Sequence, residues 1–121
     1  MNAAAETRAV VESYFSAWVD KRPDDAFKWL ANDLVFVGPT GRYTSAAEFR
    51  PALNGFSAMT GRAKIIELVV DDDRAAMLYE CELPDPVGTI HITSFFRVQE
   101  GKICWYETQF DATNFRKLQR T

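Results

Sequence analysis

Residues 88–111 read GTIHITSFFRVQEGKICWYETQFD, and this stretch decides the fold because two long runs of strand-forming residues stand back to back. The runs flank Gln99-Glu100-Gly101, where a glycine suits a tight turn. The stretch therefore predicts a β-hairpin. The preceding segments, AKIIELVVDD (63–72) and RAAMLYECEL (74–83), predict a second hairpin that turns at Asp72-Asp73.

The first half of the chain predicts helices instead. Apolar residues recur at steps of three and four between Val10 and Val19, which is typical of a helix with one buried face. DKRPDDAFKWL (20–30) predicts a second helix with Pro23 in its first turn. Ser45-Ala46-Ala47-Glu48 predicts a capping box that opens a third, short helix, which we expect Pro51 to limit.

Helices followed by an antiparallel meander predict an α+β fold. In this arrangement we expect a long, curved antiparallel sheet to wrap around the N-terminal helices and enclose a cone-shaped cavity. A length of 121 residues predicts one domain, residues 1–121. After the last strand, Asp111 is placed to cap a terminal helix.

The composition argues against several classes of function. A net charge of −3 argues against nucleic acid as a partner, because such binding needs clustered cations. No apolar run approaches the roughly 18 residues of a membrane span, and the start lacks a secretory leader, so we expect a cytoplasmic protein. Cys81 and Cys104 are then interpreted as reduced, buried thiols. With one histidine and no Cys/His cluster, we expect no metal and no cofactor.

Three segments together resemble a known family. They are VVESYFSAW (10–18), DDAFKWLANDLVFVGP (24–39) and FFRVQEGKICWYETQFD (95–111). In their order the chain resembles the SnoaL-like branch of the nuclear transport factor 2-like superfamily, which lies near ketosteroid isomerases, polyketide cyclases and limonene epoxide hydrolases. The resemblance covers nearly the whole chain. It implies the cone fold, but it does not specify a reaction.

The residues of the family's enzymes are largely absent at the matching positions. A ketosteroid isomerase needs a carboxylate base, a tyrosine and a protonated aspartate. Tyr14 matches the tyrosine, but Gly38 stands at the base position and Ser94 at the position of the second acid. The residue set of limonene epoxide hydrolases is missing as well. For cyclase-type chemistry the nearest late acid is Asp111, which strand alternation turns outward or leaves as a helix cap.

The resemblance places Ser94 on the inward face of its strand, and alternation along the strands then predicts the rest of a cavity lining. The predicted ligand-binding residues are Tyr14, Trp18, Phe36, Gly38, Met77, Tyr79, Cys81, Ser94, Phe96, Tyr106, Thr108 and Phe110. The same alternation places Cys104 on this face. These residues could also meet as a packed core. The hydroxyls among them favour a cavity, because each buried hydroxyl without a partner costs about 1–3 kcal/mol.

The opposite face of the sheet mixes large aromatic residues with polar ones. Its predicted members are His91, Thr93, Phe95, Trp105 and Glu107. Aromatic residues within a polar rim are typical of interfaces. Members of the family commonly dimerise through this face, so the resemblance implies a homodimer. A monomer in which a helix covers the same face is the alternative.

These observations lead to three hypotheses for function. The first is a SnoaL-like protein that binds a small hydrophobic molecule in the aromatic cavity. The second is an isomerase- or cyclase-type enzyme in which Tyr14 donates a hydrogen bond and Asp33 or Asp111 serves as base. The third is a module for protein interaction or oligomerisation. The sequence leaves open whether the protein is catalytic.

Overall fold

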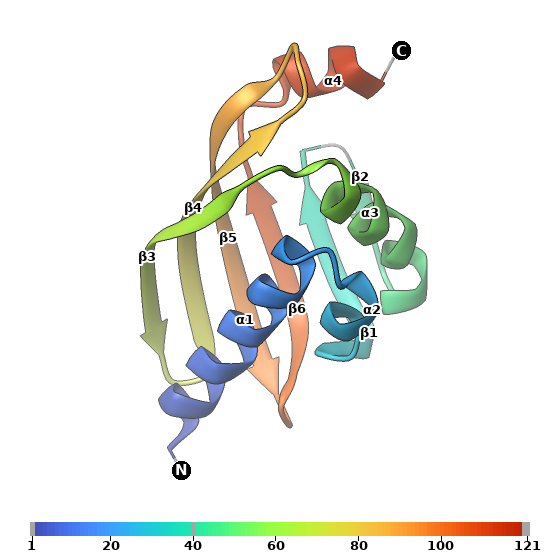
Figure 1. Cartoon of the computed structure of the whole chain (residues 1–121). Helices are drawn as coiled ribbons and strands as arrows, with labels where there is room; N and C mark the ends of the chain where they lie inside the picture. The colour runs from blue at the N-terminus through green and yellow to red at the C-terminus, as the bar shows by residue number, and fades with distance from the viewer. Residues whose placement is uncertain (1, 40, 120–121) are drawn as a thin grey trace.

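The computed structural model describes residues 2–39 and 41–119, and Figure 1 shows its helices gathered around a curved sheet. The helices are α1 (Ala3–Val19), α2 (Pro23–Phe27), α3 (Ala46–Met59) and α4 (Thr113–Gln119). The strands are β1 (Leu30–Gly38), β2 (Gly41–Tyr43), β3 (Ala63–Asp71), β4 (Arg74–Leu83), β5 (Gly88–Gln99) and β6 (Lys102–Gln109). The predicted α+β fold is confirmed. None of the described helices has the length and apolar character needed to cross a membrane.

The sheet has the strand order β2-β1-β6-β5-β4-β3. The two predicted hairpins, β3–β4 and β5–β6, are both present as antiparallel pairs. One pairing departs from the predicted antiparallel meander, because β1 runs parallel to β6. This pairing joins strands from opposite ends of the chain, so no local sequence pattern could indicate it. It brings Phe36 on β1 beside Tyr106 on β6.

A bulge in the last hairpin changes the facing of one predicted residue. Arg97 pairs with Trp105 and Val98 pairs with Ile103, so Cys104 is an extra residue between the two pairs. Ile103 therefore points into the core, where it is fully buried, and Cys104 does not share the face of Tyr106. The Cys104 thiol is only partly buried and donates to the Arg97 carbonyl at 3.4 Å. The prediction that Cys104 is buried on the inward face is wrong, whereas Cys81 is buried and both thiols are free.

Helix α3 is longer than predicted. Ser45 caps its start by accepting from the Glu48 N–H at 3.1 Å, as the capping box predicts. The helix then continues through Pro51 to Met59, so the expectation that Pro51 limits it is wrong. A proline here removes the N–H that would bond to the Ala47 carbonyl. Ala47 is exposed, so water can satisfy that carbonyl, and the helix continues.

The ends of α1 and α3 are tied together. The Ser57 hydroxyl on α3 donates to the Trp18 carbonyl on α1 at 2.6 Å. The Lys21 ammonium, just after α1, donates to the carbonyls of Ser57 at 2.6 Å and Ala58 at 3.1 Å, and also to that of Thr60. A cation among the last carbonyls of a helix interacts favourably with the helix dipole. These bonds tie the end of α3 to the end of α1.

Candidate functional site

A pocket of about 400 Å³ lies between α1, α3 and the concave face of the sheet. This volume falls within the range of about 300–1,000 Å³ that is usual for sites of small organic ligands. The described residues that line it are aromatic, aliphatic, glycine, proline or hydroxyl-bearing. They are Tyr14, Trp18, Phe36, Gly38, Pro39, Tyr43, Phe49, Pro51, Ala52, Leu53, Gly55, Phe56, Met59, Tyr79, Tyr106, Thr108, Phe110 and Phe115.

Along one wall of the pocket, aromatic rings from β1, β6 and α3 pack against one another. Phe36 on β1 stacks on Phe49 of α3 with ring centroids 4.4 Å apart. Tyr106 on β6 meets both rings edge-on, at 4.9 Å from Phe36 and 5.7 Å from Phe49. Such pairs add to area burial through the quadrupoles of the rings. The wall is therefore fixed by mutual packing before any ligand arrives.

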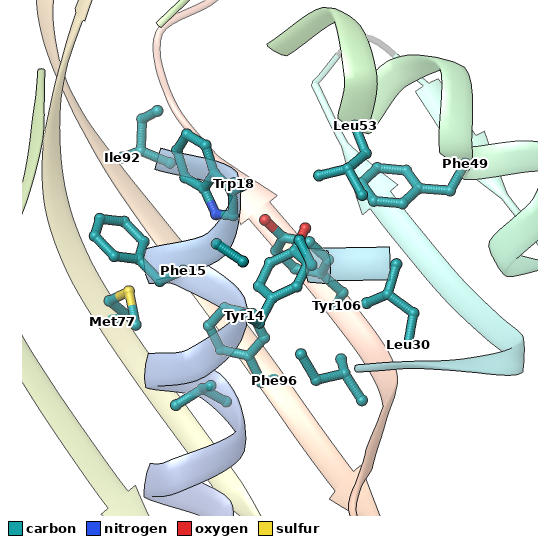
Figure 2. Close-up of a cluster of buried hydrophobic side chains, with 14 of the residues drawn as sticks. Tyr14, Phe15, Trp18, Leu30, Phe49, Leu53, Met77, Ile92, Phe96 and Tyr106 are labelled. Atoms are coloured by element: carbon teal, nitrogen blue, oxygen red, sulfur yellow. The ribbon is translucent and has the colours of Figure 1, made fainter. Parts of the chain in front are cut away.

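Tyr14 is buried at the centre of the molecule, and its hydroxyl is the sole buried side-chain N or O atom in the described residues that lacks a hydrogen-bond partner. Figure 2 shows the phenol oxygens of Tyr14 and Tyr106 pointing toward the space between Trp18 and Leu53. The two rings meet edge-on at 5.4 Å. Burial, and then the neighbouring Tyr106, hold the pKa of Tyr14 well above its ordinary value. Tyr14 is therefore a neutral hydrogen-bond donor.

Three further hydroxyls, on β4, β5 and β6, are hydrogen-bonded to one another on the inward face of the sheet. The Tyr79 hydroxyl lies 3.0 Å from Ser94 Oγ, which in turn lies 2.9 Å from Thr108 Oγ1. Burial raises the pKa of Tyr106, and the neighbouring hydroxyls of Tyr14, Thr108, Tyr79 and Ser94 oppose that rise. The polar part of the pocket thus consists of hydroxyls of lining residues, Tyr14, Tyr79, Tyr106 and Thr108 among them, set between aromatic rings.

The predicted ligand-binding set divides into two groups in the structure. Those found in the lining are Tyr14, Trp18, Phe36, Gly38, Tyr79, Tyr106, Thr108 and Phe110. Met77, Cys81, Ser94 and Phe96 point to the same side of the sheet but are buried in the core and do not line the pocket. They lie where α1 packs against the sheet, so the helix takes the space that a ligand would need.

Helix α3 contributes to the pocket, which the sequence did not predict. This helix supplies Phe49, Leu53 and Phe56, spaced by four and three residues on one face. The spacing is visible in the sequence, but a helix that ends at Pro51 would not include Leu53 and Phe56. Tyr43 on β2 was missed as well, because it reaches the pocket only through the pairing of β2 with β1.

A fourth helix borders the pocket near the end of β6. Phe115 on α4 lines the pocket and meets Phe110 edge-on at 5.4 Å. The Arg116 guanidinium donates to the Pro39 carbonyl at 3.3 Å, which fastens α4 to the end of β1. The terminal helix thus connects the two strands whose ends form the rim of the pocket.

The two acids considered as bases lie away from this lining. Asp33 and Asp111 are both exposed. Asp111 accepts a hydrogen bond from the Thr113 N–H at 3.0 Å at the start of α4. The backbone and hydroxyl of Thr113 lower the pKa of Asp111 below its ordinary value. This geometry favours the helix-capping role over the catalytic role for Asp111.

The outer face of the sheet carries the residues predicted for an interface. His91, Thr93 and Phe95 are exposed, while Trp105 and Glu107 are partly buried. The strand registers place Phe95 between Ala76 on β4 and Glu107 on β6. Val69 continues the same row on β3 and Val37 continues it on β1. His91 lies four residues before Phe95 on β5, and its Nε2 is 3.3 Å from a carboxylate oxygen of Glu80.

Comparison with known proteins places the chain in one fold group. Residues 11–106 match the profile of the SnoaL-like domain family. A protein from Kribbella flavida has 25% sequence identity and a TM-score of 0.86, over 93% of this chain and 92% of that chain. An NTF2-like protein from Cytophaga hutchinsonii has 18% identity and a TM-score of 0.77, over 93% and 94% of the two chains.

A third solved structure shares the fold at lower identity. TerC, co-crystallised with polyporic acid, has 17% identity and a TM-score of 0.79, over 96% of this chain and 99% of that chain. No curated protein matches this sequence significantly.

Proposed function

The chain belongs to the SnoaL-like domain family, and we propose that it binds a small, uncharged and mostly apolar organic molecule in the pocket under α3. The observation that carries the proposal is the Tyr14 hydroxyl, because Tyr14 lines the aromatic pocket and its hydroxyl is buried without a hydrogen-bond partner. An oxygen atom of the ligand, such as a carbonyl, would accept the hydrogen bond that Tyr14 does not make within the protein.

The energetics of burial support this assignment. A buried hydroxyl without a partner costs about 1–3 kcal/mol, so a protein that keeps one gains little stability from it. A ligand that accepts from Tyr14 recovers that cost on binding. The apolar rings around it provide contact area for the rest of the ligand. TerC, which shares the fold, was crystallised with a small organic molecule, polyporic acid.

The arrangement favours binding over proton transfer. A positioned general base contributes about 10²–10⁴-fold to a rate, and it must lie within hydrogen-bond reach of the proton that it removes. The ionisable side chains of the described lining are tyrosines, and the raised pKa values of Tyr14, Tyr79 and Tyr106 make these three donors instead of bases. We therefore place Tyr14 as a donor that orients the ligand.

The test uses two aromatic compounds of nearly equal shape, 2-acetylnaphthalene and 2-ethylnaphthalene. Isothermal titration calorimetry measures the affinity of each for the wild-type protein. We expect both to bind and the ketone to bind about tenfold more tightly, because it alone accepts a hydrogen bond. If neither compound binds, or if the hydrocarbon binds as tightly as the ketone, the proposal is wrong.

We also propose that a second copy of the chain packs on the outer face of the sheet. Phe95 and Val69 lie in one row on this face and are 36% and 56% exposed, and large apolar side chains that lie together on a surface are typical of interaction sites. A symmetric homodimer would cover both copies of the row at once. Substitution of Phe95, described in the Discussion, tests this proposal.

A further inference from the structure

Three hydroxyls form a chain across neighbouring strands. Tyr79 on β4 bonds to Ser94 on β5 at 3.0 Å, and Ser94 bonds to Thr108 on β6 at 2.9 Å. The strand registers align these residues, because Ser94 pairs with Thr108 and lies one row from Tyr79. Tyr79 and Thr108 line the pocket, whereas Ser94 is fully buried and does not reach it. The two end residues of this hydroxyl chain therefore border the pocket, and its middle residue, Ser94, does not reach it.

The number of protons limits how this chain can be ordered. Each hydroxyl has one proton to donate, although it can also accept. Ser94 has two partners, so it satisfies both bonds and its own proton by donating to one partner and accepting from the other. A phenol is a better donor than an aliphatic hydroxyl, which favours donation from Tyr79 to Ser94 and from Ser94 to Thr108. The hydroxyl proton of Thr108 is then free to be donated to a ligand in the pocket.

We propose that Ser94 is a positioning residue that orders this chain, so that Thr108 donates to an acceptor oxygen of the ligand. The inference rests on the proposed function and specifies the class of ligand, an aryl ketone or another compound with an acceptor oxygen at one end. Hydrogen bonds in series polarise one another, so the last donor is stronger than an isolated threonine. Tyr106 lines the pocket as well and adds a further hydroxyl donor to it.

A double-mutant cycle tests whether Ser94 acts through Thr108. The measured quantity is the ratio of the affinities for 2-acetylnaphthalene and 2-ethylnaphthalene. We expect Ser94→Ala and Thr108→Val each to lower this ratio by about three- to tenfold. The double variant should lower it no further than Thr108→Val alone, because both changes remove the same interaction.

Two control variants separate hydrogen bonding from packing. Ile92→Val removes one buried methyl group from the inward face of the same strand, and the ratio should stay at the wild-type value. Thr108→Ser keeps the hydroxyl and should preserve most of the ratio. If the effects of Ser94→Ala and Thr108→Val add, or if Ile92→Val lowers the ratio equally, Ser94 acts through packing and the proposal is overturned.

A spectroscopic measurement reports on the same bond. The infrared carbonyl stretch of bound 2-acetylnaphthalene shifts to lower frequency as its hydrogen bonds strengthen. We expect part of this shift to be lost in Ser94→Ala and to persist in Ile92→Val. An unchanged stretch in Ser94→Ala would overturn the proposal.

The order of the chain can also be measured without a ligand. Buried hydroxyl protons exchange slowly enough to be assigned by NMR, and their nuclear Overhauser contacts show which oxygen each one faces. We expect the Tyr79 proton to face Ser94 and the Ser94 proton to face Thr108, and the reverse order would overturn the inference. If wild-type protein binds neither naphthalene, the proposed function fails, and these contacts still decide whether Ser94 orders the chain.

Discussion

Tyr14 and Tyr79 are both buried tyrosines of the same pocket, but their hydroxyls stand in different situations. The Tyr79 hydroxyl bonds to Ser94, whereas the Tyr14 hydroxyl has no partner within the protein. Removing a paired hydroxyl leaves its partner unsatisfied, and removing an unpaired one relieves a cost. The two residues therefore offer a matched comparison between a hydroxyl that supports the fold and one that serves the ligand.

Tyr14→Phe should not destabilise the protein, and we expect its free energy of unfolding to equal or exceed that of wild type by up to about 2 kcal/mol. The affinity for 2-acetylnaphthalene should fall about tenfold, while that for 2-ethylnaphthalene stays unchanged. Urea denaturation and calorimetry measure the two effects. Tyr79→Phe is the control and should lose about 1 kcal/mol of stability. Equal destabilisation by both substitutions would contradict this assignment of Tyr14.

Gly38 lies in the lining where related isomerases would have their base, and its pocket side is occupied by an aromatic ring. A Cβ atom at this position would lie 2.9 and 3.0 Å from two carbons of the Phe36 ring. We expect Gly38→Asp to fold but to lose about 1–3 kcal/mol of stability, because the ring must leave its stack on Phe49. The double variant with Phe36→Leu should recover part of the loss in urea denaturation. No recovery would mean that the clash lies elsewhere.

At the scale of elements, α3 combines two residues that weaken a helix with a role in the pocket. Pro51 and Gly55 both lie inside it and both line the pocket. Their presence means that packing of Phe49 and Leu53 against the core, and the bonds from Lys21 at its end, hold the helix in place. Tertiary contacts, more than helix propensity, therefore stabilise this wall of the pocket.

Gly55→Ala should stabilise α3. No atom lies within 4 Å of a Cβ built at this position, and alanine in a helix interior is favoured over glycine by about 0.5–1 kcal/mol. The free energy of unfolding, measured by urea denaturation, should rise by this amount. Gly61→Ala lies outside the helix, where its Cβ would be 3.4 Å from the Glu82 carbonyl oxygen, and should give no gain. An equal gain in the free energy of unfolding for Gly61→Ala would show that the gain at Gly55 does not come from helix propensity.

At the scale of the whole molecule, the stability of the fold is sensitive to alkaline pH, because thiol and phenol groups that ionise at high pH are buried in their neutral form. Burial raises the pKa of Cys81 to about 12, and it raises the pKa values of Tyr14, Tyr79 and Tyr106 above their ordinary values. A raised pKa in the folded state means that the unfolded chain releases its proton first as pH rises. The resulting stability is present at neutral pH and is lost at higher pH.

We expect the urea midpoint to be constant near neutral pH, to decline above about pH 8.5 as the Cys81 thiol ionises in the unfolded chain, and to fall more steeply above about pH 10. Burial also raises the pKa of Cys104, so the double variant Cys81→Ala, Cys104→Ala should postpone the decline to the range in which tyrosines ionise. Denaturation curves collected at intervals of pH test this. A midpoint that stays constant to pH 11 would show that these groups are not protected in the folded state.

The proposed dimer is also a property of the whole molecule. Phe95→Asp places a charge in the middle of the outer row, where a second copy would have to bury it. We expect wild-type protein to sediment as a dimer and the variant as a folded monomer. Ala9→Glu changes an exposed residue on α1 and should leave the dimer intact. A wild-type monomer in analytical ultracentrifugation would refute the proposal.

The amino-acid sequence by itself determined the elements and their faces. The hairpin of residues 88–111 and the buried stripe of α1 follow from periodicity between near neighbours, and once the resemblance places Ser94 inward, the same alternation places Phe96 inward. Together with the order of the segments, these features were sufficient to predict the α+β cone fold. They predicted the part of the pocket that the strands and α1 supply.

Only the tertiary structure decided how these elements combine into a site. The parallel pairing of β1 with β6, the bulge at Cys104 and the continuation of α3 beyond Pro51 depend on contacts between distant residues. The separation of Ser94 from the lining, and the lone Tyr14 hydroxyl, depend on where α1 fills the concave face. Local periodicity states which side of an element is buried. What that side meets is decided by packing, because the space between elements is filled by residues from the whole chain.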